Sequence, residues 1–248
     1  MSDSVAILAE MIRQAEKVVA FTGAGISTES GIADFRSPGG VWSRHQPVLF
    51  EDFIRDAEER RRFWRMRREL LPTMLKAQPN QGHRALAALE SRGRLLAVIT
   101  QNIDELHQKA GSRRVVEIHG TAMKVHCLDC DNRWPADEFQ TRLDAGEEDF
   151  TCDLCGGLLK SMTVSFGQGI PPAVWQEAAA LSKSCDLFLA IGSSLVVQPA
   201  AALPEAARRH SARLVVINRE TTPLDSQANL VIHAPIGETL DRAESLLR

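Results

Sequence analysis

The stretch Leu95-Leu96-Ala97-Val98-Ile99-Thr100-Gln101-Asn102-Ile103-Asp104 decides the fold. Its apolar first half is typical of a buried strand, and polar side chains follow at once. The shorter stretch Val115-Val116-Glu117-Ile118-His119-Gly120 has the same order. Open α/β sheets bind ligands in a crevice beyond the carboxyl ends of their strands. The two stretches therefore predict one pocket whose floor is supplied by two strands.

The rest of the chain alternates strands with helices. Short apolar runs predict further strands at residues 18–21, 187–191, 214–217 and 230–232. Helical spacing predicts helices over residues 4–16, 48–76, 83–89, 103–110, 172–181 and 199–208, with one more at the C-terminus. This alternation indicates an α/β fold with a doubly wound parallel sheet and right-handed crossovers.

A glycine turn follows the first strand, in the run Thr22-Gly23-Ala24-Gly25-Ile26-Ser27. Strand, glycine turn and helix start are typical of a phosphate cradle, because glycine lets backbone N–H groups approach an anion. The usual dinucleotide fingerprint has a third glycine where this chain has Thr28, so a plain tight turn and a cofactor loop both remain open. The long glycine-rich segment 31–40 that follows favours a binding loop.

The polar residues of the predicted pocket also have structural interpretations. Asn102 and Asp104 can contact a polar ligand, or they can cap the helix that follows them. His119 can act as a general base, or it can be a buried histidine satisfied by the backbone. His83, at the start of the helix predicted over residues 83–89, is most simply a capping or packing histidine.

Four of the five cysteines form the pairs Cys127-Leu128-Asp129-Cys130 and Cys152-Asp153-Leu154-Cys155, separated by 21 residues. This spacing is close to that of a zinc ribbon, in which four thiolates hold one Zn²⁺ tetrahedrally. Such a site has no open position, so we expect the zinc to be structural. The fifth cysteine, Cys185, is predicted to be a packing residue.

The composition is that of an ordinary globular protein. The chain has 248 residues and a formal net charge of −3, which gives no overall attraction to nucleic acid or membrane. No run approaches the ~18 apolar residues of a membrane span, and no signal peptide is recognisable, so we expect a cytoplasmic protein without a membrane partner. Residues 48–76 are rich in arginine with acidic residues interleaved, which favours a salt-bridged helix over an anion or nucleic-acid patch.

The ordered motifs resemble those of the sirtuins, NAD-dependent protein lysine deacylases. The resemblance runs from about Val18 to Ile236. The motifs that carry it, in order, are Gly23-Ala24-Gly25-Ile26-Ser27, Gly31-Ile32 through Asp34-Phe35-Arg36, Thr100-Gln101-Asn102-Ile103-Asp104, His119-Gly120, the two cysteine pairs, Phe166-Gly167, Gly192-Ser193-Ser194 and Asn218.

The resemblance implies a Rossmann-like NAD-binding domain and a small domain made of a four-cysteine zinc ribbon and a helical insert. The NAD-binding domain would consist of residues 1–36, 77–123 and 162–248. The small domain would have its helical part at residues 37–76 and its zinc ribbon at residues 124–161. The implied NAD contacts are Gly23, Ala24, Gly25, Ser27, Asp34, Phe35, Arg36, Gln101, Asn102, Ile103, Asp104, Gly192, Ser193, Ser194, Asn218, Arg219 and Ile236. The implied acyl-lysine tunnel includes Val164, Phe166, Gly167 and Val196.

The resemblance also implies the chemistry. Nicotinamide leaves the ribose, the acyl oxygen captures the anomeric carbon, and His119 acts as general base on a ribose hydroxyl, with Asn102 as the other catalytic residue. The products would be free lysine, nicotinamide and O-acyl-ADP-ribose. The partners would be acylated-lysine proteins or peptides, and no direct nucleic-acid binding is expected. Mono-ADP-ribosyl transfer at the same NAD site and an NAD-responsive binding module are the alternative functions.

The sequence departs from the family pattern in a few places. Ser161 stands where many sirtuins have proline, Gln168 where they have glutamate, and Ser193 where threonine is commoner. Sirtuins that remove acidic acyl groups resemble one another in a Tyr-x-x-Arg pair, and the corresponding residues here are Trp64 and Arg67. Arg67 can pair with a distal carboxylate, but Trp64 lacks the hydroxyl. We therefore expect a deacetylase, with desuccinylation or demalonylation through Arg67 as the alternative.

Overall fold

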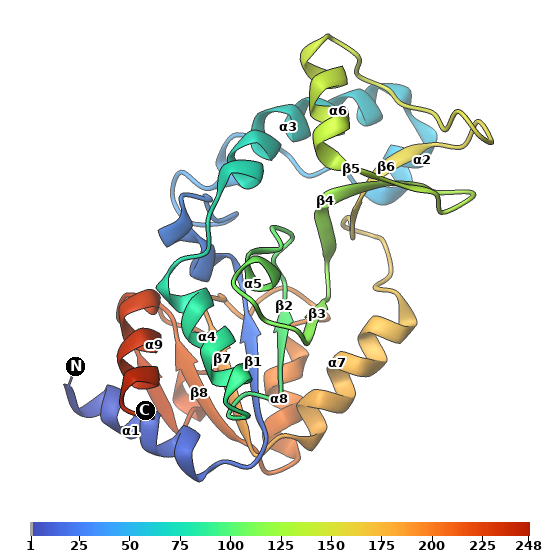
Figure 1. Ribbon diagram of the computed structural model, residues 1–248. Helices are drawn as coiled ribbons and strands as arrows, with labels where there is room; N and C mark the ends of the chain where they lie inside the picture. The colour runs from blue at the N-terminus through green and yellow to red at the C-terminus, as the bar shows by residue number, and fades with distance from the viewer. Residues whose placement is uncertain (1) are drawn as a thin grey trace.

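A computed structural model describes residues 2–248 and contains a central parallel sheet (Figure 1). Its six strands follow the order β3-β2-β1-β7-β8-β9. All neighbouring strands pair in parallel. The strands are β1 (Val18–Thr22), β2 (Ala97–Thr100), β3 (Val115–Glu117), β7 (Leu187–Ile191), β8 (Arg213–Ile217) and β9 (Leu230–Ile232). The predicted α/β fold with a doubly wound, Rossmann-like sheet is confirmed.

Helices cover both faces of this sheet, so its strands are apolar throughout. In β1, Val18 and Ala20 belong to one apolar cluster, whereas Val19 and Phe21 belong to the cluster on the opposite face. The alternation follows from the period of two residues in a strand. The first cluster is covered by α1 (Ser2–Gln14), α4 (Gln81–Ser91) and α9 (Ile236–Ser245), and the second by α7 (Pro172–Ser184) and α8 (Ala202–Arg209).

A second, smaller unit is formed by three antiparallel strands and three helices, and it lies beyond the carboxyl ends of the main sheet (Figure 1). Its strands follow the order β5-β4-β6. The elements are β4 (Gly120–Cys127), β5 (Arg133–Pro135), β6 (Leu159–Thr163), α2 (Phe50–Arg55), α3 (Ala57–Lys76) and α6 (Ala136–Asp144). They share an apolar core that includes Phe53, Trp64, Phe139 and Phe150.

The structure corrects several predicted helix boundaries. The single helix predicted over residues 48–76 is two helices, because Asp56 has an extended backbone and its carboxylate accepts a hydrogen bond from the Glu58 N–H to cap α3. The helix predicted over residues 103–110 is reduced to α5 (Leu106–Lys109). The helix start predicted after the first glycine turn is instead a 3₁₀ segment, Ala24–Ser30.

The arginines of α3 pair with acidic residues. Arg60 contacts Asp149 at 3.0 Å, Arg61 contacts Glu58 at 2.8 Å, and Arg62 contacts Glu59 at 2.6 Å. Arg65 and Arg68 also have acidic partners, on α3 itself, on α6 or on the segment that follows α6. These pairs support the interpretation of a salt-bridged helix. Within residues 2–248, no helix has the length and apolar character needed to cross a membrane.

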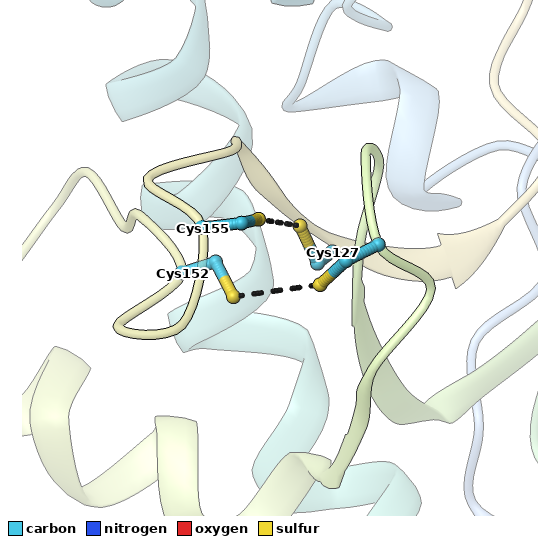
Figure 2. A group of neighbouring side chains, drawn as sticks. Cys127, Cys152 and Cys155 are labelled. Atoms are coloured by element: carbon cyan, nitrogen blue, oxygen red, sulfur yellow. Dashed lines mark hydrogen bonds between the residues drawn. The ribbon is translucent and has the colours of Figure 1, made fainter.

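The four paired cysteines converge at one end of the smaller unit. Their sulfur atoms all lie within 4.8 Å of one another. Figure 2 shows Cys127, Cys152 and Cys155 pointing toward each other, and the Cys127 and Cys155 sulfurs are 3.4 Å apart. A tetrahedral Zn²⁺ with Zn–S bonds of about 2.3 Å requires sulfur separations of about 3.8 Å, so the site fits a structural zinc ion.

We predict that the smaller unit depends on this metal. Cys127 and Cys152 are part of its apolar core, so losing the zinc loosens the packing as well as the loops. Elemental mass spectrometry should find one zinc ion per wild-type chain. Cys152→Ser should lose it and lower the free energy of unfolding by at least about 3 kcal/mol.

Cys185→Ser is the matched control, because Cys185 is buried under the main sheet, away from the four-sulfur cluster. It should retain the zinc. A wild-type chain without metal, or a Cys152→Ser chain with unchanged zinc content, contradicts the prediction.

Candidate functional site

One large pocket lies between the carboxyl ends of the main sheet and the smaller unit. Both predicted strand ends contribute to it, since Gln101, Asn102 and His119 line the same space. The predicted residues that line it are Gly23, Ala24, Gly25, Asp34, Phe35, Arg36, Arg67, Gln101, Asn102, Ile103, His119, Val164, Phe166, Gly167, Gly192, Ser193, Ser194, Asn218, Arg219 and Ile236. The structure thus brings together residues that are more than two hundred positions apart in the sequence.

Two predicted NAD contacts, Ser27 and Asp104, lie behind the pocket wall. The Asn102 amide donates to the Ser27 hydroxyl at 3.0 Å, and that hydroxyl donates to Asp104 at 2.7 Å. Asp104 also accepts from the Leu106 N–H at 3.0 Å, which is the capping role that the sequence left open. Burial raises the pKa of Asp104, although these hydrogen bonds oppose the shift. Both residues therefore orient Asn102 from behind.

Trp64 does not line the pocket, contrary to the substrate-binding role expected for it. Its side chain is 1% exposed and packs against Phe139 and Phe150, with ring centroids 5.9 and 4.7 Å away. Helical spacing explains the difference, because positions 63, 66, 67 and 70 share the face of α3 that lines the pocket, and position 64 is turned toward α6. Phe63, Met66 and Leu70 are therefore pocket residues that the sequence analysis missed.

Val196 is also placed outside the pocket lining. Its side chain is 52% exposed, and the next residue, Val197, lines the pocket instead. The preceding Leu195 has a left-handed backbone with φ of 54°, so the chain turns sharply after Ser194.

The hydrogen bonding of His119 leaves one ring nitrogen available to accept a proton. Its Nδ1 lies 3.1 Å from the carbonyl oxygen of Gln101, which can only accept a hydrogen bond. The neutral ring therefore carries its proton on Nδ1, and the lone pair on Nε2 is free to accept one. Burial lowers the pKa of His119, the Gln101 carbonyl opposes this, and the charge of Arg36 adds to the lowering. The ring is consequently neutral near pH 7, with the lone pair of Nε2 available.

The glycine loops at the other end of the pocket approach each other backbone to backbone. A Cβ atom on Gly25 would lie 2.8 Å from both the Cα and the carbonyl oxygen of Gly192. Gly192 itself has φ of 62°, a conformation that favours glycine. A side chain at Gly25 or Gly192 would push the two loops apart. This close contact explains why both positions are glycine. Exposed backbone N–H groups in such loops are suited to anionic groups.

The loop 31–40 folds over the pocket. Asp34 accepts hydrogen bonds from the N–H groups of Arg36 and Ser37 at 2.9 and 2.7 Å. Burial raises the pKa of Asp34, but the Ser37 and Arg36 contacts outweigh it and the pKa is lowered overall. Phe35 packs against Trp42, and Trp42 against Phe166, with centroids 5.2 and 6.0 Å apart. The loop is therefore tied to the segment that follows β6.

Arg67 is a buried cation at the pocket wall. Its side chain is 4% exposed, and its Nη2 donates to the Ala122 carbonyl oxygen at 2.8 Å. Its Nε has no hydrogen-bond partner, and no carboxylate of residues 2–248 pairs with it. Burial lowers the pKa of Arg67 to about 10, so the group is still charged at neutral pH.

Comparisons with known proteins agree with this geometry. A family model described as Sir2 family matches residues 23–199. A curated relative from Bradyrhizobium diazoefficiens, named NAD-dependent protein deacetylase 1, is 49% identical over 94% of this chain and 92% of its own length. A relative from Archaeoglobus fulgidus, named NAD-dependent protein deacylase 2, is 40% identical over 98% of this chain and 95% of its own length.

Solved structures give the same result. A Sir2 histidine variant described with a deacetylated p53 peptide and 3′-O-acetyl ADP-ribose superimposes with a TM-score of 0.92, 36% identity and 98% coverage of both chains. A Sir2 complex described with p53 peptide and NAD⁺ has a TM-score of 0.88 and 36% identity, covering 97% of both chains. This chain belongs to the Sir2 family.

Proposed function

We propose that this chain is an NAD-dependent protein lysine deacylase that acts mainly on acetyl-lysine. The observation that carries the proposal is the neutral His119, whose Nε2 is free to accept a proton, in the same pocket as Asn102 and the glycine loops. The relatives named NAD-dependent protein deacetylase and deacylase support the same activity. The products would be free lysine, nicotinamide and O-acyl-ADP-ribose.

The pocket lining supports a placement for each reactant. NAD would lie along the main sheet, with its phosphates at Ala24 and Gly25 and its adenosine toward Ser194 and Asn218. Acyl-lysine would enter from the other side, past Val164, Phe166 and Gly167. The two would meet at Asn102 and His119, which line the space between these ends.

The resemblance to the sirtuins implies the chemistry at this meeting point, and the free Nε2 of His119 fits it. After nicotinamide leaves, the acyl oxygen bonds to the anomeric carbon and forms an imidate. His119 Nε2 then takes the proton of a ribose hydroxyl, and that oxygen attacks the imidate carbon. Water completes the transfer and releases lysine. A cytoplasmic location fits the proposal, because thiols stay reduced there and remain available to hold zinc.

We predict that His119→Ala abolishes deacylation. With NAD and an acetylated peptide, the wild-type protein should form O-acetyl-ADP-ribose, which is detected by mass spectrometry. The variant should be slower by at least about 100-fold, a typical contribution of a general base. His210→Ala, which changes an exposed histidine at the end of α8 that does not line the pocket, should match the wild type. ADP-ribosylated protein in place of O-acetyl-ADP-ribose would support the transferase alternative and contradict the proposal.

The pH dependence should follow the pKa of His119. The base works only when neutral, so kcat/KM should fall as the pH drops through its pKa. Burial lowers that pKa below its ordinary value of 6.5, so the acidic limb should have its midpoint below 6.5. A midpoint above 6.5 in a kcat/KM profile is the result that this account does not allow.

The acyl preference should depend on Arg67. We predict that acetyl-lysine is the preferred substrate, because Trp64 is turned away and offers no second polar contact. Any activity on succinyl-lysine should require the Arg67 guanidinium and fall at least about tenfold in Arg67→Met. Arg65→Met, on the exposed face of the same helix, is the matched control. A panel of acyl-lysine peptides measures both activities. Succinyl-lysine activity that survives Arg67→Met contradicts the role of Arg67.

A further inference from the structure

Two buried histidines face each other behind the pocket floor. His83 belongs to α4 and His107 to α5, and their side chains are 0% and 1% exposed. Their ring centroids are 4.9 Å apart, and neither ring lines the pocket. Each ring has one nitrogen without a hydrogen-bond partner, Nε2 of His83 and Nδ1 of His107. An unpartnered buried polar atom is costly, so this pair calls for an explanation.

The hydrogen bonds of His83 determine where its proton lies. Its Nδ1 is 3.4 Å from the backbone nitrogen of Asn80, as part of the capping box at the start of α4. A backbone N–H can only donate, so Nδ1 of His83 is an acceptor. The neutral ring therefore carries its proton on Nε2, and this N–H is a buried donor without an acceptor.

The contacts of His107 lead to the complementary result. Its Nε2 lies 2.9 Å from the Thr22 hydroxyl, and Thr22 donates to the Thr100 hydroxyl at 2.8 Å. Because the Thr22 proton is used in that bond, Thr22 accepts from His107 and Nε2 carries the proton. Nδ1 of His107 is then a buried acceptor without a donor.

The chain of contacts continues to the pocket. The Thr100 hydroxyl accepts a hydrogen bond from the Asn102 N–H at 3.1 Å, and the Asn102 side chain lines the pocket. The Gln101 N–H also donates to the Thr22 carbonyl oxygen at 2.9 Å. The turn that carries Gln101 and Asn102 is therefore anchored to Thr22 and Thr100, and through them to His107.

We propose that His83 and His107 form a hydrogen-bond relay that positions Asn102. The Nε2–H of His83 would donate to Nδ1 of His107, directly after a small rotation of the rings or through one buried water. This contact satisfies both unpartnered nitrogens at once. It also fixes His107 as the tautomer that donates to Thr22 and so holds the backbone at Asn102. The two histidines are positioning residues and touch no reactant.

The relay requires both rings to be neutral, and their surroundings favour this. Burial lowers the pKa of His83 to about 4, and the charge of Arg84 acts in the same direction. Burial lowers the pKa of His107 well below its ordinary value, and His83 adds to this lowering. At neutral pH each ring therefore has one donor and one acceptor, as the relay needs.

The tautomers can be tested directly by NMR of ¹⁵N-labelled protein at neutral pH. His83 and His107 should both carry their proton on Nε2, and the ¹⁵N signal of His107 Nδ1 should show that it accepts a hydrogen bond. His83→Phe keeps a ring at this position and removes the donor, so the His107 Nδ1 signal should move toward that of a free acceptor. A proton on Nδ1 of His107 overturns the relay, as does an unchanged His107 signal in His83→Phe.

Kinetics test the positioning role, which rests on the proposed function because it assumes that Asn102 contacts NAD. His83→Phe should lower kcat/KM for NAD about tenfold, the effect of one unsatisfied buried group, and leave KM for the acetyl-peptide within twofold. His83→Gln keeps both a donor and an acceptor and should restore most of the activity. His210→Gln, on the surface, should not differ from wild type.

Thr22→Val interrupts the same relay one step further along. Because both changes break one network, the double variant His83→Phe/Thr22→Val should lose little more than either single variant. Equal losses in His83→Phe and His83→Gln, or fully additive losses in the double variant, overturn the proposal. The NMR result does not depend on enzymatic activity, so it separates failure of the relay from failure of the deacylase assignment.

Discussion

The contact on which the site depends is the backbone crossing at Gly120, where the chain leaves the main sheet for the smaller unit and later returns. Gly120 pairs with Thr163 at the junction of β4 and β6, and the Val164 N–H donates to the His119 carbonyl oxygen at 2.8 Å. Gly120 has φ of 70°, and a Cβ atom there would lie only 2.0 Å from the Met162 carbonyl oxygen. Only glycine allows the two strands to approach this closely.

This crossing places the proposed general base next to the side of the pocket proposed for acyl-lysine. His119 immediately precedes the crossing on the outgoing strand, and Val164 and Phe166 immediately follow it on the returning one. From Phe166, aromatic contacts continue through Trp42 to Phe35 in the loop 31–40. One backbone contact and a short aromatic chain thus link His119, the segment 164–166 and the loop 31–40, although these segments are far apart in the sequence.

The sequence predicted those parts of the site that depend on local pattern. The apolar runs gave the strands of the main sheet, and the polar residues at their ends, such as Gln101, Asn102 and His119, do line one pocket. The cysteine spacing gave the four-sulfur cluster. In each case the residues concerned lie directly at a strand end or in a short motif, so the chain position determines the spatial position.

Features that depend on packing between distant segments were not predicted. The motif position of Trp64 predicts a place in the pocket, but the aromatic core with Phe139 and Phe150 determines which way α3 is rotated. His83 was interpreted only as a capping or packing residue, because nothing in its own segment indicates that His107 lies beside it. The break at Asp56 was hidden by helix-favouring residues on both sides.

The most direct test is a crystal structure with an acetyl-lysine peptide and a slowly reacting NAD analogue bound together. The account predicts that the ribose on the nicotinamide side lies between Asn102 and His119, with a ribose hydroxyl within hydrogen-bond distance of His119 Nε2. The acyl oxygen should face the anomeric carbon from the side of Val164 and Phe166. A ribose that makes no contact with His119, or a peptide bound away from the anomeric carbon, would contradict the account.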